Sequence, residues 1–105
     1  MIELNKQQMK YLRKYAQKEK AIFQIGKLGL TEVFIQQVEA ALNKRELVKF
    51  NVLQNSDEEI KEVAQQLSEV LRAVVVQTIG NTAILYRPSQ ESKNQKLSLD
   101  IQELS

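Results

Sequence analysis

The chain lacks cysteine, histidine and tryptophan, and its 105 residues include one proline and three glycines. Without cysteine no disulfide can form, as is usual in the reducing cytoplasm. The absence of histidine and cysteine removes the common zinc ligands, the histidine base of a catalytic triad and the thiolate nucleophile. No apolar run approaches the roughly 20 residues that span a membrane. We therefore expect a cytoplasmic protein without enzymatic activity, metal, cofactor or membrane partner.

Charge is distributed unevenly along a chain whose composition is otherwise that of one globular domain, with 43% hydrophobic and 27% charged residues. Residues 1–54 carry ten Lys and Arg against five Asp and Glu, a net charge of +5. Residues 55–105 carry five against eight, a net charge of −3, which leaves the overall +2. A basic N-terminal half is typical of a surface that binds a polyanion.

The spacing of apolar residues and the capping signals predict the element order α-β-α-β-α-β-β. Helices are expected over residues 5–18, after Thr31 as N-cap, and after Ser56, which pairs with Glu59 in a capping box. Strands are expected over residues 21–25, 47–52, 73–79 and 82–86, the last two joined by a Gly80-Asn81 hairpin turn. This order predicts a small two-layer α/β sandwich with a mixed four-stranded sheet. The apolar run 73–79 is typical of a central strand in that sheet.

The composition changes after Pro88, where Ser, Gln, Asn and Lys become frequent. We therefore expect one domain over residues 1–88, followed by a loosely ordered C-terminal tail over residues 89–105. Leu97, Leu99 and Ile101 alternate along this tail, which is the spacing of a marginal edge strand.

Two of the three glycines frame the stretch Gly26-Lys27-Leu28-Gly29, between a predicted strand and a predicted helix. Glycine lets the backbone approach another molecule closely or adopt a positive φ. The helix N-terminus that follows offers amide donors and the positive end of a dipole, which suits a phosphate. Lys27 adds a mobile cation, and Leu28 either packs under the loop, which we favour, or touches a base. The pattern favours a grip on a nucleic-acid backbone, although a plain strand-to-helix turn would use the same glycines.

A basic arc along the first predicted helix supplies further candidate contacts, because few acidic residues interrupt it. Tyr11 and Tyr15 lie at its margin, where they either stack on bases or pack along the helix flank. Arg87, at the end of the last strand, either contacts RNA or forms a structural ion pair. The candidate RNA-binding residues are thus Gly26, Lys27, Leu28, Gly29, Lys10, Arg13, Lys14, Lys18, Lys20 and Arg87.

The stretch from Ile25 to Glu32, IGKLGLTE, resembles the signature loop of the CRM domain (chloroplast RNA splicing and ribosome maturation), above all its single-domain bacterial form, the YhbY family. The basic first helix and the closing stretch from Thr78 to Pro88 also agree, so the resemblance covers residues 1 to about 90. Asn81 departs from the pattern where a basic residue is common, and Ala21 departs where proline is frequent.

The resemblance implies a fold like that of the C-terminal domain of translation initiation factor three. It also implies RNA binding through the glycine loop and the adjacent basic surface. For bacterial members it points to precursors of the large ribosomal subunit, with large-subunit rRNA as the partner and ribosomal proteins as further partners.

Three alternatives stay open from the residues alone. The Gly-x-x-Gly pattern also resembles the KH module, but there the loop joins two helices, whereas here it follows a predicted strand. A protein-interaction adaptor would use the loop only as a turn. A small enzyme acting on phosphorylated substrates would use it to hold a phosphate, although the missing histidine and cysteine argue against this.

Overall fold

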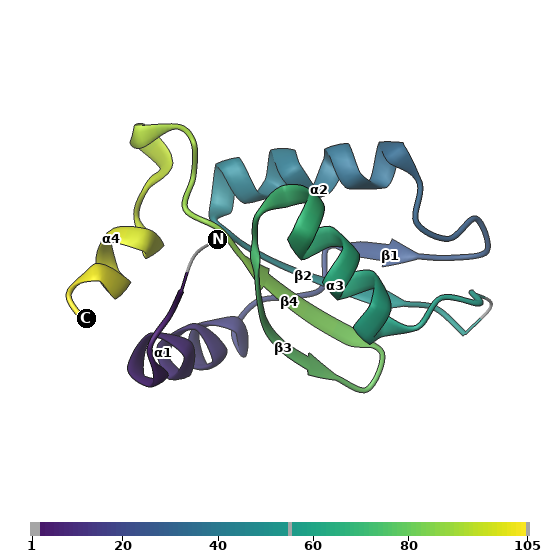
Figure 1. Cartoon of the computed structure of the whole chain (residues 1–105), viewed down its shortest axis with the longest axis horizontal. Coiled ribbons are helices and arrows are strands. Elements are labelled where there is room, and N and C mark those ends of the chain that lie inside the picture. The colour runs from purple at the N-terminus through teal and green to yellow at the C-terminus, as the bar shows by residue number, and fades with distance from the viewer. Residues whose placement is uncertain (1–2, 55, 105) are drawn as a thin grey trace.

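A mixed four-stranded sheet with helices on both faces organises the protein (Figure 1), as seen in a computed structural model that describes residues 3–54 and 56–104. The elements are, in order, α1 (Lys6–Ala16), β1 (Phe23–Ile25), α2 (Glu32–Arg45), β2 (Leu47–Val52), α3 (Ile60–Leu71), β3 (Val74–Ile79), β4 (Thr82–Tyr86), a 3-10 helix η1 (Ser92–Asn94) and α4 (Leu97–Gln102). The first seven confirm the predicted order. Among the described residues, no helix combines the length and apolar character that a membrane span requires.

The strand order is β1-β2-β4-β3, with β1 parallel to β2 and β4 antiparallel to both of its neighbours. The mixed four-stranded sheet is therefore confirmed, but β3 lies at an edge rather than in the centre. The two-residue turn places β4 beside β3, and β4 then uses its other side to pair with β2. Gly80 in that turn has a φ of +56°, a backbone conformation that favours glycine.

One face of the sheet packs against α2 and α3 and holds the larger core. Phe34 of α2 meets Phe23 and Phe50 edge to face, with ring centroids 5.8 and 5.9 Å apart. The predicted capping box before α3 is wrong, because the helix begins at Ile60 and its N-cap has no side-chain hydrogen bond. Ser56 instead accepts the N–H of Glu58 at 3.2 Å in the turn that precedes the helix.

The opposite face packs against α1 and α4, which form a partial third layer below and beside the sheet (Figure 1). Leu12 and Ala16 of α1 and Leu97 and Ile101 of α4 are buried together there, around Tyr86 of β4. The expected edge strand over residues 97–101 is thus wrong, because the segment is helical. Leu97 and Ile101 are four residues apart, a spacing that places both on one side of a helix.

The C-terminal segment is held by Glu46, which is why the expectation of a loose tail fails. Glu46 follows α2 with a φ of +70° and is fully buried. One carboxylate oxygen accepts the N–H of Ser89 at 2.7 Å, and the other accepts those of Lys96 and Ser98 at 3.0 and 3.1 Å. Burial alone would raise the pKa of Glu46, but hydrogen bonds from Ser98, Ser89 and Lys96 outweigh it and lower the pKa.

Candidate nucleic-acid interface

The glycine loop forms a tight turn between β1 and α2. The N–H of Gly29 donates to the carbonyl of Gly26 at 3.0 Å, which leaves Lys27 and Leu28 at the two central positions. Gly29 has a φ of +70°, the conformation that favours glycine, so the fourth position of the turn needs this residue. Thr31 caps α2 as predicted, since its hydroxyl oxygen accepts the N–H of Phe34 at 3.1 Å. The turn therefore places the N-terminus of a 14-residue helix directly behind an exposed lysine.

Leu28 does not pack under the loop, contrary to the expectation. It is 88% exposed, the most exposed of the large hydrophobic side chains that are described. The turn projects Leu28 and Lys27 outward together, because both occupy its centre. An apolar and a cationic side chain are therefore presented side by side to whatever approaches the loop.

A carboxylate lies against the same loop. A Cβ placed on Gly29 would come within 2.7 Å of Oε1 of Glu58, from the turn before α3. No local sequence pattern indicates this neighbour, since the two positions are 29 apart along the chain. Its negative charge repels an anion on that side of the turn. Within residues 3–54 and 56–104 no three acidic residues are grouped in a way that would hold a metal ion.

A groove of about 290 Å³ runs beside the loop, between edge strand β1 and the first turns of α2. Besides the loop itself its lining includes Gln24 of β1 and Val33, Phe34 and Gln37 of α2. Val33 and Gln37 are one helical turn apart and both are exposed. The sequence reasoning missed this groove. The sequence feature that could have indicated it is Val33, an apolar residue on the solvent-facing side at the start of α2.

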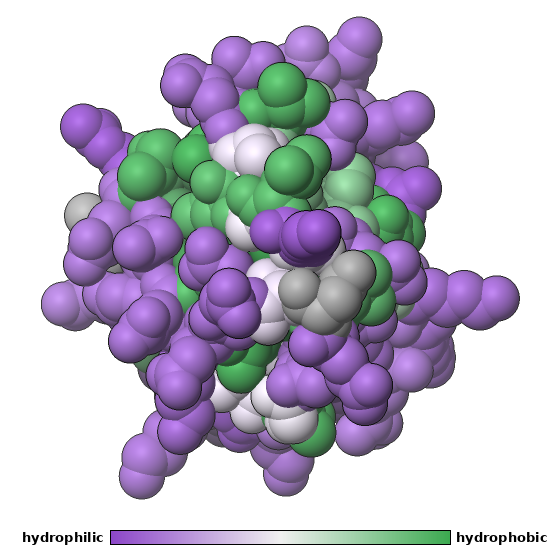
Figure 2. All heavy atoms as spheres, turned by 90° about the vertical axis from the view of Figure 1, so that its right-hand side faces the viewer, coloured by the Kyte–Doolittle hydropathy of each residue, from purple (hydrophilic) through white to green (hydrophobic). Residues whose placement is uncertain are grey.

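The groove and loop belong to the end of the molecule where β1, β2 and β3 terminate, at the right of Figure 1. Viewed from that side, hydrophobic side chains gather mainly in the upper half of the surface, and hydrophilic side chains lie between and around them (Figure 2). The exposed hydrophobic residues at the ends of these elements are Leu28, Val33, Leu53 and Ile79. This end of the sheet thus combines exposed apolar area with the cation of Lys27.

The basic arc of α1 lies elsewhere on the molecule. Helix α1 covers the face of the sheet opposite α2, and Figure 1 shows it at the lower left while the glycine loop is at the right. Lys10, Lys14 and Lys18 are exposed, Arg13 is half-buried, and Lys20 is exposed between α1 and β1. The described residues form a single ion pair, which involves none of these side chains. The structure thus leaves the arc accessible but does not merge it with the loop into one patch.

Arg87, one of the expected RNA contacts, is buried in the structure, with a side chain that is 7% exposed. Its guanidinium donates to the carbonyl of Leu71 at 2.8 Å and to Oδ1 of Asn43 at 2.7 Å, and it pairs with Glu39 at 3.4 Å. These contacts tie the end of β4 to α2 and α3. The structural ion pair is thus the alternative that the structure supports for Arg87.

The sequence of residues 4–87 matches the family model of the CRS1/YhbY (CRM) domain. The chain belongs to the CRM domain family. The resemblance drawn from the glycine loop is thereby confirmed, and the match ends at Arg87, before the segment that Glu46 holds.

Relatives of this CRM domain carry names that refer to RNA. Over 94 residues it is 44% identical to YqeI of Bacillus subtilis, a probable RNA-binding protein, in a match that spans 90% of this chain and 98% of the relative. It is 36% identical to an RNA-binding protein of Haemophilus influenzae, over 90% of this chain and 96% of the relative. The solution structure of a hypothetical Staphylococcus aureus protein suggested to bind RNA superposes with a TM-score of 0.71 and 44% identity. That match covers 90% of this chain and 98% of the other.

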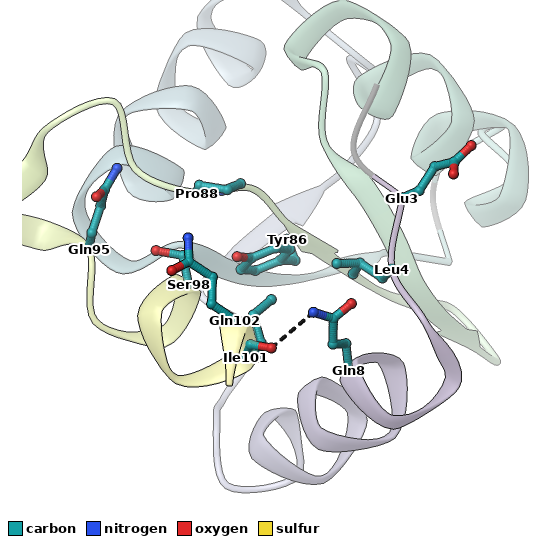
Figure 3. A pocket seen from close by; sticks show the side chains of 9 residues that line it. All are labelled: Glu3, Leu4, Gln8, Tyr86, Pro88, Gln95, Ser98, Ile101 and Gln102. Carbon is teal, nitrogen blue, oxygen red and sulfur yellow. Dashed lines mark hydrogen bonds between the residues drawn. The ribbon is translucent and has the colours of Figure 1, made fainter. Parts of the chain in front are cut away.

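A second hollow of about 230 Å³ lies far from the glycine loop of the CRM domain, between the start of α1, the end of β4 and α4 (Figure 3). Figure 3 shows Gln8 reaching toward Ile101, whose carbonyl accepts its amide N–H at 2.9 Å. Burial raises the pKa of Tyr86 in its wall, and the charge of Glu46 adds to this. The hollow marks where the C-terminal segment docks, and none of the predicted RNA contacts is among the described residues that line it.

Proposed function

We propose that this protein binds RNA during ribosome assembly in the cytoplasm, holding the backbone of large-subunit rRNA or its precursor through the Gly26–Gly29 loop. It acts as a binding protein rather than an enzyme. RNA binding in general is supported by the names of the relatives. The ribosomal target is supported by the resemblance to the single-domain bacterial members of the family.

The observation that carries the loop's role is the joint placement of a tight turn, an exposed Lys27 and the N-terminus of α2. Backbone amides at a helix start and a nearby ammonium group suit a phosphate oxygen. Such contacts position an RNA strand and carry little information about its bases.

The arc on α1 contributes at longer range in this proposal. Lys10, Lys14 and Lys18 have no acidic partner within 4.0 Å among the described residues, so their charge is available to RNA. In this proposal an RNA held at the loop reaches them by passing along the β1 edge and then Lys20, which lies between α1 and β1. Each phosphate neutralised by such a lysine releases counterions, which gives the complex a steep salt dependence.

The test is a fluorescence-anisotropy titration of labelled large-subunit rRNA fragments at low and at physiological salt. We compare the wild type with Lys27→Glu and with the matched control Lys93→Glu, an exposed lysine of η1 at the other end of the molecule. Reversing a charge is preferred here to filling Gly29, because a side chain there would be strained by the positive φ. We expect Lys27→Glu to weaken binding by roughly 10-fold at low salt and Lys93→Glu by less than about 2-fold.

Equal effects of the two substitutions, together with affinity that disappears at physiological salt, would refute the loop's role. The exposed hydrophobic residues at this end of the sheet would then favour a surface that binds a protein partner. Saturable binding of a nucleotide or sugar phosphate with turnover would instead support an enzyme.

A further inference from the structure

The groove beside the glycine loop differs chemically from a phosphate site. Among the described residues that line it, Lys27 is the one charged side chain, and the remaining wall includes Val33 and the largely buried Phe34. Phosphate is held by amides and cations, whereas these walls offer apolar contact. The groove therefore suits a part of the RNA that is flat, uncharged and capable of hydrogen bonding.

Two features at the rim supply hydrogen bonds. Gln37 lies one helical turn beyond Val33, is exposed, and carries a carboxamide with both a donor and an acceptor. Gln24 lies in the middle of β1, whose outer side is an edge of the sheet. An edge strand presents backbone N–H and C=O groups to its surroundings.

The size and position of the groove limit what occupies it. Its volume of about 290 Å³ is at the lower end of the pockets that hold small molecules, so it has room for a base but not for a folded partner. Leu28 lies both in the loop and in the groove lining. A nucleotide whose phosphate is held at the loop would thus have its base next to the groove.

We propose that this groove is a subsite for one unpaired nucleobase of the bound RNA, with Val33 and Leu28 against its face and Gln37 on its hydrogen-bonding edge. The subsite rests on the proposed RNA grip and adds base preference to it. Single-stranded RNA is commonly read in this way, by apolar contact with the base and hydrogen bonds to its edge. A base inside a duplex could not enter, because its edge is already paired.

The test compares Gln37→Leu with Gln36→Leu in the full chain. Gln36 is the matched control, since it is an exposed glutamine of the same helix that does not line the groove. Both proteins and the wild type are titrated by anisotropy with single-stranded oligomers of about eight A, C or U nucleotides, and with a fully paired RNA duplex. Lys27→Glu is included to report on the loop itself.

We expect the wild type and Gln36→Leu to bind one oligomer at least about fivefold more tightly than the others and than the duplex. Gln37→Leu should lose this preference and still bind RNA through the loop. Equal affinity of the wild type for all three oligomers, an unchanged preference in Gln37→Leu, or duplex binding as tight as that of single strands would each overturn the subsite. If Lys27→Glu still weakens binding in those cases, the proposed function survives; if it has no effect, both proposals fail.

Discussion

Replacing Glu46 by Gln tests the buried carboxylate that docks the C-terminal segment. In the wild type, one oxygen accepts the N–H of Ser89 and the other accepts those of Lys96 and Ser98. Glutamine keeps the shape of glutamate but has one acceptor oxygen and an NH2 group. In either orientation the NH2 group faces at least one backbone N–H, so a buried donor loses its partner.

The magnitude follows from these contacts. A buried donor without a partner costs about 1–3 kcal/mol, and hydrogen bonds to a neutral acceptor contribute less than those to a charged one. The single oxygen of glutamine accepts hydrogen bonds from at most two of the three backbone N–H groups. We therefore expect Glu46→Gln to lower the free energy of unfolding by about 2–4 kcal/mol. For a chain of this length that corresponds to a fall in Tm of roughly 10–25 °C.

The effect also depends on pH with a defined sign. Because folding lowers the pKa of Glu46, its stabilisation is present above the ordinary value of 4.5 and is lost as the pH falls through the folded value. The wild type should therefore lose stability below about pH 4.5. Glu46→Gln lacks this titration, so the difference in Tm between the two proteins should shrink in acid.

Thermal unfolding followed by circular dichroism between about pH 7 and pH 3 measures both effects. Glu32→Gln is the control, because Glu32 is an exposed carboxylate in the first turn of α2, where the expected loss is about 1 kcal/mol or less. A Tm of Glu46→Gln as close to the wild type as that of Glu32→Gln, with the same pH profile, would refute the role given to the buried carboxylate.

Removing residues 89–105 should lower Tm by more than about 10 °C, since the apolar contacts of Leu97 and Ile101 are lost with the segment; an unchanged melting curve would show that the segment contributes nothing. Arg87→Met should lower the free energy of unfolding by about 2–4 kcal/mol and leave the RNA affinity of the folded protein unchanged. A loss of RNA affinity without a loss of stability would show that Arg87 contacts RNA. Glu58→Gln should tighten RNA binding by roughly 2–5-fold at low salt and by less at high salt, because it removes a negative charge beside Gly29; weaker binding would mean that this carboxylate supports the loop instead.

Local signals in the sequence were enough for most of the elements. The Thr31 cap and the Gly80-Asn81 turn depend on neighbouring residues, and both are found in the structure. The glycine loop was recognised for the same reason, because its four residues are contiguous. Whether the predicted lysines contact RNA stays a prediction.

Features that depend on distant residues could not be predicted from local patterns. The apolar run of β3 suits an edge or a centre equally well, and only the pairing of β4 with β2 decides between them. Ser, Gln and Asn in the C-terminal segment indicate a loose tail, yet backbone N–H groups of that segment donate to a carboxylate 43 to 52 positions earlier.

The sequence by itself determined the order of the first seven elements, the glycine loop and the family, because each is encoded in contiguous residues or in a short period. The tertiary structure decided which side chains remain available to a partner. It buried Arg87, exposed Leu28, brought Glu58 against Gly29 and formed the groove between β1 and α2. Burial and electrostatic neighbourhood are properties of three-dimensional packing, and residues far apart along the chain set them.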